Sequence, residues 1–305
     1  MNFDRIDFVK YRKWYFLVSA VIIAAGLLVM AFAGFNAGVD FKSGTSLDIN
    51  VESGNLTSQQ ALELIQAGRP EGSPPTITIG GDNANRVSAR FDEVLDEDTR
   101  NRILEQFAHA FGEEEISYEE STVDTQIARE FAQRAAVVLL IASIGIVVYI
   151  MIRFEWRFAL AAAITVFHDA LFVLSIFAIF RFEFNLTIIA AILTVVGYSV
   201  NDTIVLFDRM RENLQKIKLK TDEDLAHLVN LSIRQTLTRA INTGLTIVIP
   251  AVLLMLIGSE GIRNFSIAMV IGLIAAAYSS IFMAAQLWLV FKKNSMNASK
   301  QSAAN

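Results

Sequence analysis

Asp202 is the side chain in this sequence best placed for chemistry, because it lies within a run of apolar residues long enough to cross a lipid bilayer. A charged group near the centre of a membrane helix costs about 2.5–3.5 kcal/mol, so it needs a partner, a water-filled cavity or a bound proton. Helical spacing places five residues on one face: Thr194, Tyr198, Asn201, Asp202 and Val205. We expect this polar face to point into the protein and away from lipid.

Arg239 is a possible basic partner for Asp202. Asp202 lies six residues before Asp208, where the fourth apolar run ends, which places it ~9 Å inside the membrane. Arg239 lies five residues beyond Arg234 in the following run, ~8 Å inside from the same side. One interpretation is a proton switch, in which a proton on Asp202 releases Arg239. A static salt bridge explains the spacing equally well, as does an Arg239 side chain that reaches back to the membrane surface.

His168 and Asp169 form a second ionisable pair inside an apolar run. The pair is either a proton relay or a hydrogen-bonded structural feature, and the sequence leaves both interpretations open. Tyr198 and Asn201 are interpreted as accessory polar residues that orient or pack near Asp202.

Two alternatives use the same residues differently. Intramembrane aspartyl proteases need two carboxyl groups that share a proton, and Asp169 and Asp202 lie on neighbouring runs. Their depths disagree, however, since Asp169 is ~18 Å inside from Arg157, twice the depth of Asp202. A small-molecule exporter of the RND type is the other alternative, although such exporters usually carry two repeats in one chain. No cofactor or metal site is expected, because cysteine is absent and the three histidines lie far apart.

Six apolar runs position these side chains. The 305-residue chain is 53% hydrophobic and only 19% charged, which is too apolar for a soluble protein of this size. About 20 residues cross the hydrocarbon core. The predicted spans are 14–35, 134–152, 158–180, 186–207, 237–257 and 265–291. The first resembles a signal peptide in its basic start but is longer, and no clear cleavage site precedes Gly38, so we expect an uncleaved anchor.

The basic residues that flank the spans predict the orientation. Lysine and arginine concentrate in segments 1–13, 153–157, 208–236 and 292–305. With six spans these four segments lie on one side, which the positive-inside rule assigns to the cytoplasm. We therefore expect a multi-pass protein with both termini and the loop 208–236 in the cytoplasm. The polar tail 292–305 is expected to be disordered.

Residues 36–133 form the one sizeable hydrophilic segment, including a linker helix before the second span. Residues 36–130 carry 19 acidic and 7 basic residues, a net charge of −12, while the rest of the chain has a net charge of +7. Nucleic acid is therefore not expected as a partner. Its predicted elements are strand 46–51, helix 57–66, strand 76–79, strand 86–91, helix 96–111 and strand 115–122. This βαββαβ order predicts a ferredoxin-like α+β domain outside the cytoplasm, attached to an α-helical membrane bundle of six transmembrane helices.

Several motifs of the chain resemble the SecF family. The most specific joins Gly197-Tyr198-Ser199-Val200-Asn201-Asp202 to Asp208-Arg209-Met210-Arg211-Glu212-Asn213. Supporting motifs are Gly38-Val39-Asp40-Phe41, Gln235-Thr236-Leu237-Thr238-Arg239 and Tyr278-Ser279-Ser280-Ile281-Phe282. The resemblance extends over nearly the whole chain.

The resemblance implies a function in protein export from bacteria. It implies an RND-like subunit of the SecDF accessory complex in the bacterial cytoplasmic membrane, with SecD, the SecYEG translocon and translocating preproteins as partners. It also implies that the proton gradient drives motion of the extracytoplasmic domain, without enzymatic activity or a cofactor. In such proteins the residues that match Asp202 and Arg239 take part in proton conduction.

Overall fold

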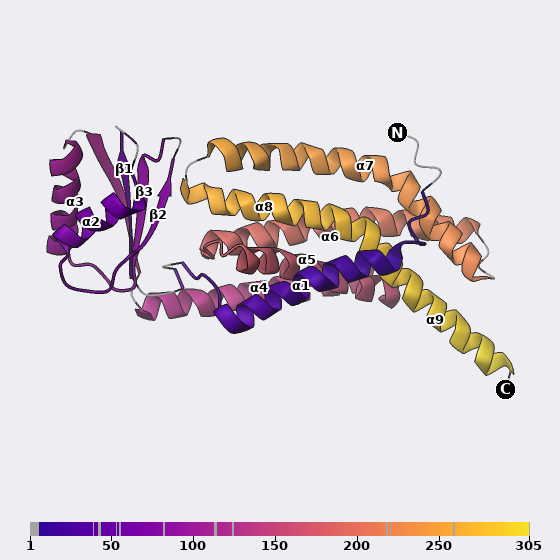
Figure 1. Ribbon diagram of the computed structural model, residues 1–305. Helices are drawn as coiled ribbons and strands as arrows, with labels where there is room; N and C mark the ends of the chain where they lie inside the picture. Colours follow the sequence, from indigo (N-terminus) through magenta and orange to yellow (C-terminus); the bar gives the residue numbers. More distant parts are fainter. Residues whose placement is uncertain are drawn as a thin grey trace. The chain divides into compact units, whose positions relative to one another are not determined.

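The computed structural model describes residues 6–304, except for residues 39, 42, 43, 53, 55, 82, 113, 114, 124, 218, 220 and 259. The chain divides into two compact units, one of helices and one built around a β-sheet (Figure 1). The helical unit comprises Met1–Asn36, Val138–Glu183 and Thr187–Asn305. The sheet unit comprises Ala37–Val137 together with Phe184–Leu186. We describe each unit separately.

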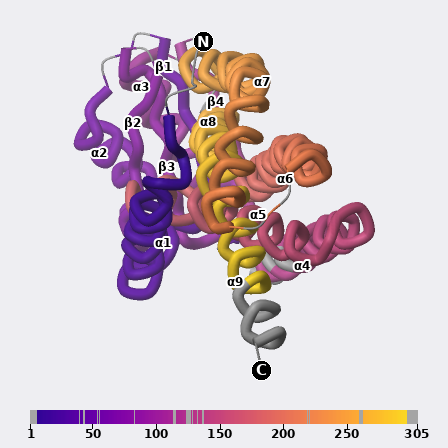
Figure 2. Tube along the Cα trace, turned by 90° about the vertical axis from the view of Figure 1, so that its right-hand side faces the viewer, coloured from indigo at the N-terminus to yellow at the C-terminus, as the bar shows by residue number. Residues whose placement is uncertain are grey.

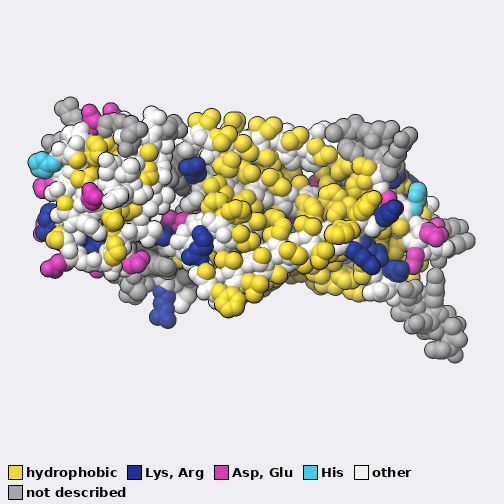
Figure 3. Space-filling model, in the orientation of Figure 1, with side chains coloured by type: hydrophobic (Ala, Val, Ile, Leu, Met, Phe, Trp, Pro, Cys, Tyr) yellow, Lys and Arg dark blue, Asp and Glu magenta, His cyan; other side chains and the backbone are white. Residues whose placement is uncertain are grey.

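Six helices or helical runs of the described residues are long and apolar enough to cross a membrane. They are α1 (Arg12–Ala33), α4 (Thr125–Arg153), α5 (Trp156–Ile179), α6 (Leu186–Lys216), α7 (Asp222–Ile257) and the continuous run of α8 (Glu260–Ser279), a π-helical turn (Ser280–Ala284) and α9 (Ala285–Ala304). Large apolar side chains are exposed on their surface, with Phe32 at 88%, Ile152 at 82% and Ile257 at 81%. Hydrophobic side chains cover much of the visible face of the helical unit (Figure 3). A multi-pass membrane protein is therefore established, as predicted.

Two of these helices extend well beyond the predicted spans. We expected 208–236 to be a loop, but α6 continues to Lys216 and α7 already begins at Asp222. The reason is that the polar segment has an apolar face with helical spacing, where Met210, Leu225 and Leu228 are fully buried. A capping box at Thr221 starts α7, since the Asp224 amide donates to the Thr221 hydroxyl over 3.1 Å.

The prediction of a disordered tail at 292–305 is wrong in the structure, where α9 runs to Ala304. Composition alone suggested disorder because the segment is polar. A helix that is already formed, however, gains one hydrogen bond for each residue it adds, and the tail contains good helix formers such as alanine, lysine and glutamine. Figure 2 shows α8 passing directly into α9.

The sheet unit has the predicted βαββαβ order. Its elements are β1 (Gly44–Val51), α2 (Ser58–Gly68), β2 (Thr76–Gly80), β3 (Arg86–Phe91), α3 (Glu97–Phe111) and β4 (Ile116–Val123). The strands lie in the order β2-β3-β1-β4, and every neighbouring pair is antiparallel. The β2–β3 hairpin pairs Thr76 with Arg90, as expected from the glycine-rich segment between the two strands.

One face of this sheet packs against α2 and α3 (Figure 1). Alternate residues of β1 and β3, such as Leu47, Ile49 and Val87, are fully buried there. Gly68 permits a close approach of the two helices, because a Cβ at this position would lie 2.7 Å from the Ile103 Cα. The Thr57 side chain caps α2 in a capping box with Gln60.

Candidate functional site

Asp202 lies midway along α6 and is half-buried. The polar groups that interact with its carboxyl group are the Ser280 hydroxyl and, through charge, the Arg239 guanidinium. The Ser280 Oγ also lies 3.1 Å from the Thr203 Oγ1. Asp202 therefore contacts the π-helical turn that joins α8 to α9, a connection that the sequence analysis did not include.

Arg239 does not form an ion pair with Asp202 in the structure. Across the described residues, no hydrogen bond or ion pair within 4.0 Å involves its guanidinium. The side chain is exposed on α7, yet it acts on Asp202 through the Coulomb interaction. The two residues are thus coupled by charge without being in direct contact.

The predicted polar face of α6 does not point entirely into the bundle, as we had expected. Thr194 and Asn201 are exposed on the surface of the helical unit, together with Gly197 between them. The Thr194 hydroxyl donates to the Ala190 carbonyl oxygen over 2.8 Å, which satisfies it within the helix. A Cβ at Gly197 would meet no atom within 4 Å. The physical reason is that one bundle of six helices buries only the opposite face of α6.

Tyr198 lies between these two faces. Its hydroxyl is buried and has no hydrogen-bond partner in the part of the chain that the structure describes. The hydroxyl oxygen lies 3.4 Å from where a Cβ would sit on Gly244 of α7. Tyr198 therefore reaches across to α7, the helix that carries Arg239.

His168 and Asp169 form a separate, fully enclosed cluster on α5. Asp169 has no exposed surface, and His168 is 5% exposed. The His168 Nδ1 lies 2.9 Å from one Asp169 carboxyl oxygen. The other carboxyl oxygen accepts hydrogen bonds from the Ser279 hydroxyl, over 2.8 Å, and from the Ser199 hydroxyl. No hydrogen bond joins Asp169 to Asp202 among the described residues, so the pair of carboxyl groups that an aspartyl protease needs is not formed.

The sequence analysis missed four hydroxyl side chains of these sites: Ser199, Thr203, Ser279 and Ser280. The available signal was the adjacent pair Ser279-Ser280 inside an apolar span, where a hydroxyl needs a partner. Nothing in the sequence indicated that a π-helical turn begins at Ser280. Such turns are rare and often occur at functional sites.

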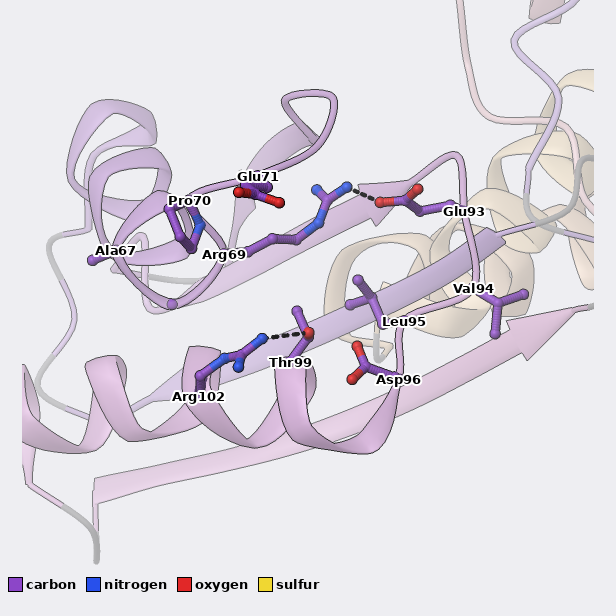
Figure 4. Close-up of a pocket in the computed structure, with 11 residues that line it drawn as sticks. Ala67, Arg69, Pro70, Glu71, Glu93, Val94, Leu95, Asp96, Thr99 and Arg102 are labelled. Atoms are coloured by element: carbon purple, nitrogen blue, oxygen red, sulfur yellow. Dashed lines mark hydrogen bonds and ion pairs between the residues drawn. The ribbon is translucent and has the colours of Figure 1, made fainter.

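The sheet unit contains one pocket of about 480 Å³ between the end of α2 and the start of α3 (Figure 4). Arg69 reaches across it to form an ion pair with Glu93 and lies over the Phe91 ring, 5.1 Å from its centroid. Arg102 donates to the Thr99 hydroxyl over 2.8 Å. Arg69 is thus engaged by an acidic partner of the same domain, whereas the hydrogen bond of Arg102 goes to a neutral hydroxyl group.

A metal centre is not indicated for the residues that the structure describes, since no group of three or more histidine, aspartate or glutamate side chains is arranged to hold an ion.

Comparison with known proteins identifies the family. Residues 103–294 match the family model described as "Protein export membrane protein SecD/SecF, C-terminal". The chain belongs to the SecD/SecF family. Relatives in this family are named as protein translocase subunits.

The relatives differ in length. The chain is 40% identical to the protein translocase subunit SecF of Alicyclobacillus acidocaldarius, over 96% of this chain and 94% of that protein. It is 41% identical to the protein translocase subunit SecDF of Bacillus subtilis, over 95% of this chain but only 38% of the Bacillus protein. The chain therefore spans less than half the length of some relatives.

Solved structures of the family share the fold. The crystal structure of SecDF from Thermus thermophilus, a translocon-associated membrane protein, superposes with a TM-score of 0.84 at 29% identity. The match covers 95% of this chain and 39% of that chain. SecDF in its super-membrane-facing form matches with a TM-score of 0.70 and 27% identity, over 99% of this chain and 41% of the other.

Proposed function

We propose that the chain acts as a SecF-type subunit that uses the proton gradient to promote export of preproteins, with Asp202 as the group that takes up and releases the proton. The observation that supports this most directly is the setting of Asp202. The half-buried carboxyl group of Asp202 lies within a membrane helix and interacts with the Ser280 hydroxyl and, through charge, with the exposed Arg239 guanidinium. Intramembrane carboxyl groups with these surroundings are typical of proton pathways.

Arg239 and the residues Tyr198 and Asn201 are proposed to complete the pathway. When Asp202 is ionised, Arg239 is attracted to it, and a proton on Asp202 removes that attraction. The Tyr198 hydroxyl is directed towards α7, the helix that carries Arg239, and has no hydrogen-bond partner among the described residues, so it can bond a water on the proposed pathway.

The proposed partner is a second membrane bundle of the SecD type. Thr194, Asn201 and Arg239 are polar yet exposed on the surface of this bundle, where lipid would leave them poorly solvated. The Bacillus and Thermus relatives named SecDF are more than twice as long as this chain, which leaves room in them for another bundle. The Thermus relative is described as translocon-associated, which supports association with a translocon. SecYEG as that translocon, and preproteins as its cargo, are proposed from the family resemblance.

The remaining parts of the proposal concern the sheet unit and the orientation. The strand order β2-β3-β1-β4 with antiparallel neighbours supports a ferredoxin-like domain. The distribution of basic residues supports a location in the bacterial cytoplasmic membrane with both termini inside and this domain outside. The proton gradient would then move the domain, with no cofactor required.

The available energy limits what such motion can do. One charge that crosses the membrane releases about 2.3 kcal/mol per 100 mV. This is enough to shift a two-state equilibrium but is smaller than the free energy of unfolding of a typical domain, 5–15 kcal/mol. We therefore propose a ratchet that acts on chains that are already unfolded.

The test is Asp202→Asn, with Asp208→Asn as the matched control. Asp208 lies six residues along the same helix, outside the predicted span, and pairs with Arg153 over 3.3 Å. Proton conduction is measured in vesicles that contain the chain together with its SecD-type partner, and preprotein export is measured in parallel. We expect Asp202→Asn to abolish proton-dependent export and Asp208→Asn to retain it. Full proton-driven export in Asp202→Asn would overturn the proposal.

A further inference from the structure

The His168–Asp169 dyad is an ionisable pair that the proposed pathway around Asp202 does not use. It lies on α5, enclosed by α6 and by the end of α8. A structural pair would be expected to satisfy all its polar atoms, because an unpaired polar atom inside a bundle is costly. Asp169 meets this expectation, with three hydrogen-bonding neighbours: His168, Ser199 and Ser279.

His168 does not meet it. Its Nε2 is buried and has no hydrogen-bond partner among the described residues. A purely structural role at this position requires only the Nδ1, which an asparagine side chain could supply. The free Nε2 therefore leaves a titratable nitrogen at a place where hydrogen bonding alone does not require one.

The charge of the dyad also suggests a change of protonation. With Asp169 ionised and His168 neutral, the dyad has a net charge of −1, and the carboxylate oxygens can accept hydrogen bonds from the Nδ1–H and the two serine hydroxyls. One added proton forms an N–H bond at the free Nε2, breaks no bond within the dyad, and brings its net charge to zero. The hydrogen bonds of Asp169 are the same in both states, so the dyad can alternate between them without rearrangement.

The dyad and Asp202 contact consecutive residues of one helix. Ser279 donates to Asp169, and Ser280, the first residue of the π-helical turn, binds Asp202 and lies beside Thr203. A π-helical turn carries one residue more than a regular turn, and this arrangement aims two adjacent hydroxyls at two different carboxyl groups. A change of charge at either carboxyl group therefore acts on the same turn.

We propose that the His168–Asp169 dyad is a second proton-binding site inside the bundle, coupled to Asp202 through Ser279 and Ser280. The inference rests on the proposed function, in which Asp202 takes up a proton. The proton comes from a hydronium ion, which leaves as neutral water when the Nε2–H bond forms. The two sites are linked because Ser279, the last residue of α8, and Ser280, the first of the π-helical turn, are adjacent in the chain.

Few other ionisable groups lie near the dyad. Asp202 and Tyr198 are on α6, Tyr278 is on α8 and Tyr15 is on α1. The Tyr278 hydroxyl donates to the Tyr15 carbonyl oxygen over 2.7 Å, which directs it towards α1. None of these four forms a hydrogen bond or ion pair with His168 or Asp169 within the described part of the chain. Asp202 is thus the ionisable residue whose effect on the protonation of the dyad should be tested.

The first experiment uses the unaltered protein. The chain is labelled with ¹⁵N-histidine, paired with its SecD-type partner in lipid, and observed by NMR over a range of pH. Its three histidines allow the His168 signal to be assigned by single substitution. We expect His168 to titrate and its midpoint to shift in Asp202→Asn but not in Asp208→Asn. A His168 signal that does not change with pH, or that ignores Asp202→Asn, would overturn the proposal.

The second experiment measures proton conduction in His168→Asn, which keeps a donor near the Nδ1 position but cannot titrate. His227→Asn, on the exposed surface of α7, is the control. We expect conduction to fall by roughly 5- to 150-fold in His168→Asn, the usual range of coupling between two sites, and not in His227→Asn. Unchanged conduction in His168→Asn, while Asp202→Asn abolishes it, would leave the proposed function standing and refute the second site.

Discussion

At the scale of single residues, Asp7 and Asn230 attach the segment before α1 to α7. The Asn230 amide donates to the Asp7 carboxyl group over 2.8 Å, and its oxygen accepts the Phe8 amide over 2.8 Å. The Asp7 carboxyl group also accepts the Lys10 amide over 3.1 Å. These bonds hold a chain segment in place before the first membrane helix begins, and they depend on an ionised carboxyl group.

This attachment predicts a dependence on pH. The hydrogen bond from Asn230 is the main cause that lowers the pKa of Asp7 from its ordinary value of 3.8. A lowered pKa means that the folded state favours the ionised form, so the stabilisation is present above pH 3.8 and is lost as the pH falls through the lowered pKa. We expect hydrogen exchange at the Phe8 and Lys10 amides to lose protection in that acid range.

Asp7→Asn provides the control for this prediction. The variant cannot ionise, so comparison at each pH removes the intrinsic pH dependence of amide exchange. An equal acid response in both proteins would show that Asp7 does not hold the segment.

At the scale of elements, small residues set how closely the helices pack. A Cβ on Gly26 of α1 would lie 2.2 Å from the Ser175 Cβ and 2.4 Å from its Cα on α5. A Cβ on Gly272 of α8 would lie 2.4 Å from a Val195 methyl group on α6. Membrane helices lack a hydrophobic drive to associate, so close contact of this kind contributes much of their affinity.

Gly26→Ala is therefore expected to destabilise the bundle. The added methyl group overlaps the α5 backbone, so α1 must shift, at a cost of about 1–3 kcal/mol. Gly145→Ala on α4 is the matched control, because a Cβ there would meet nothing within 4 Å. Thermal unfolding in lipid nanodiscs should show a lower midpoint for Gly26→Ala only. Equal midpoints for the two variants would contradict the close packing of α1 on α5.

At the scale of the whole molecule, polar side chains on the surface of the helical unit indicate that its membrane part is incomplete alone. Thr194, Asn201 and Arg239 are exposed, and the same unit also exposes large apolar residues that suit lipid, such as Leu256. A protein partner could form hydrogen bonds with the exposed polar side chains, while lipid could cover the exposed apolar ones. The two surfaces should therefore respond differently when a partner bundle binds.

Spin labels can distinguish the two surfaces. The chain has no cysteine, so single variants such as Asn201→Cys and Leu256→Cys can be labelled selectively. We expect the label at position 201 to lose accessibility to dissolved oxygen when the SecD-type partner is present, because the partner would cover it. The label at 256 should stay accessible to lipid-soluble oxygen. The same accessibility at position 201 with and without the partner would contradict the proposed interface.

The sequence by itself determined the elements of this protein. Six apolar runs and the strand Arg86–Phe91 were predicted, and each of the six runs overlaps an observed membrane-capable helix or helical run. These features depend on local composition and spacing, which do not change with the tertiary packing of the chain. The helical extension of α6 and α7 was missed because the polar character of the segment concealed its apolar face.

Only the tertiary structure decided how those elements meet. It placed β1 between β3 and β4, left Arg239 apart from Asp202, exposed Asn201, and brought Ser279 and Ser280 to two different carboxyl groups. Each of these results joins residues that are distant in the chain or depends on which helix face a neighbour covers. Depth along a helix follows from counting residues, but the direction of a side chain around that helix is fixed by the packing of the helices against one another.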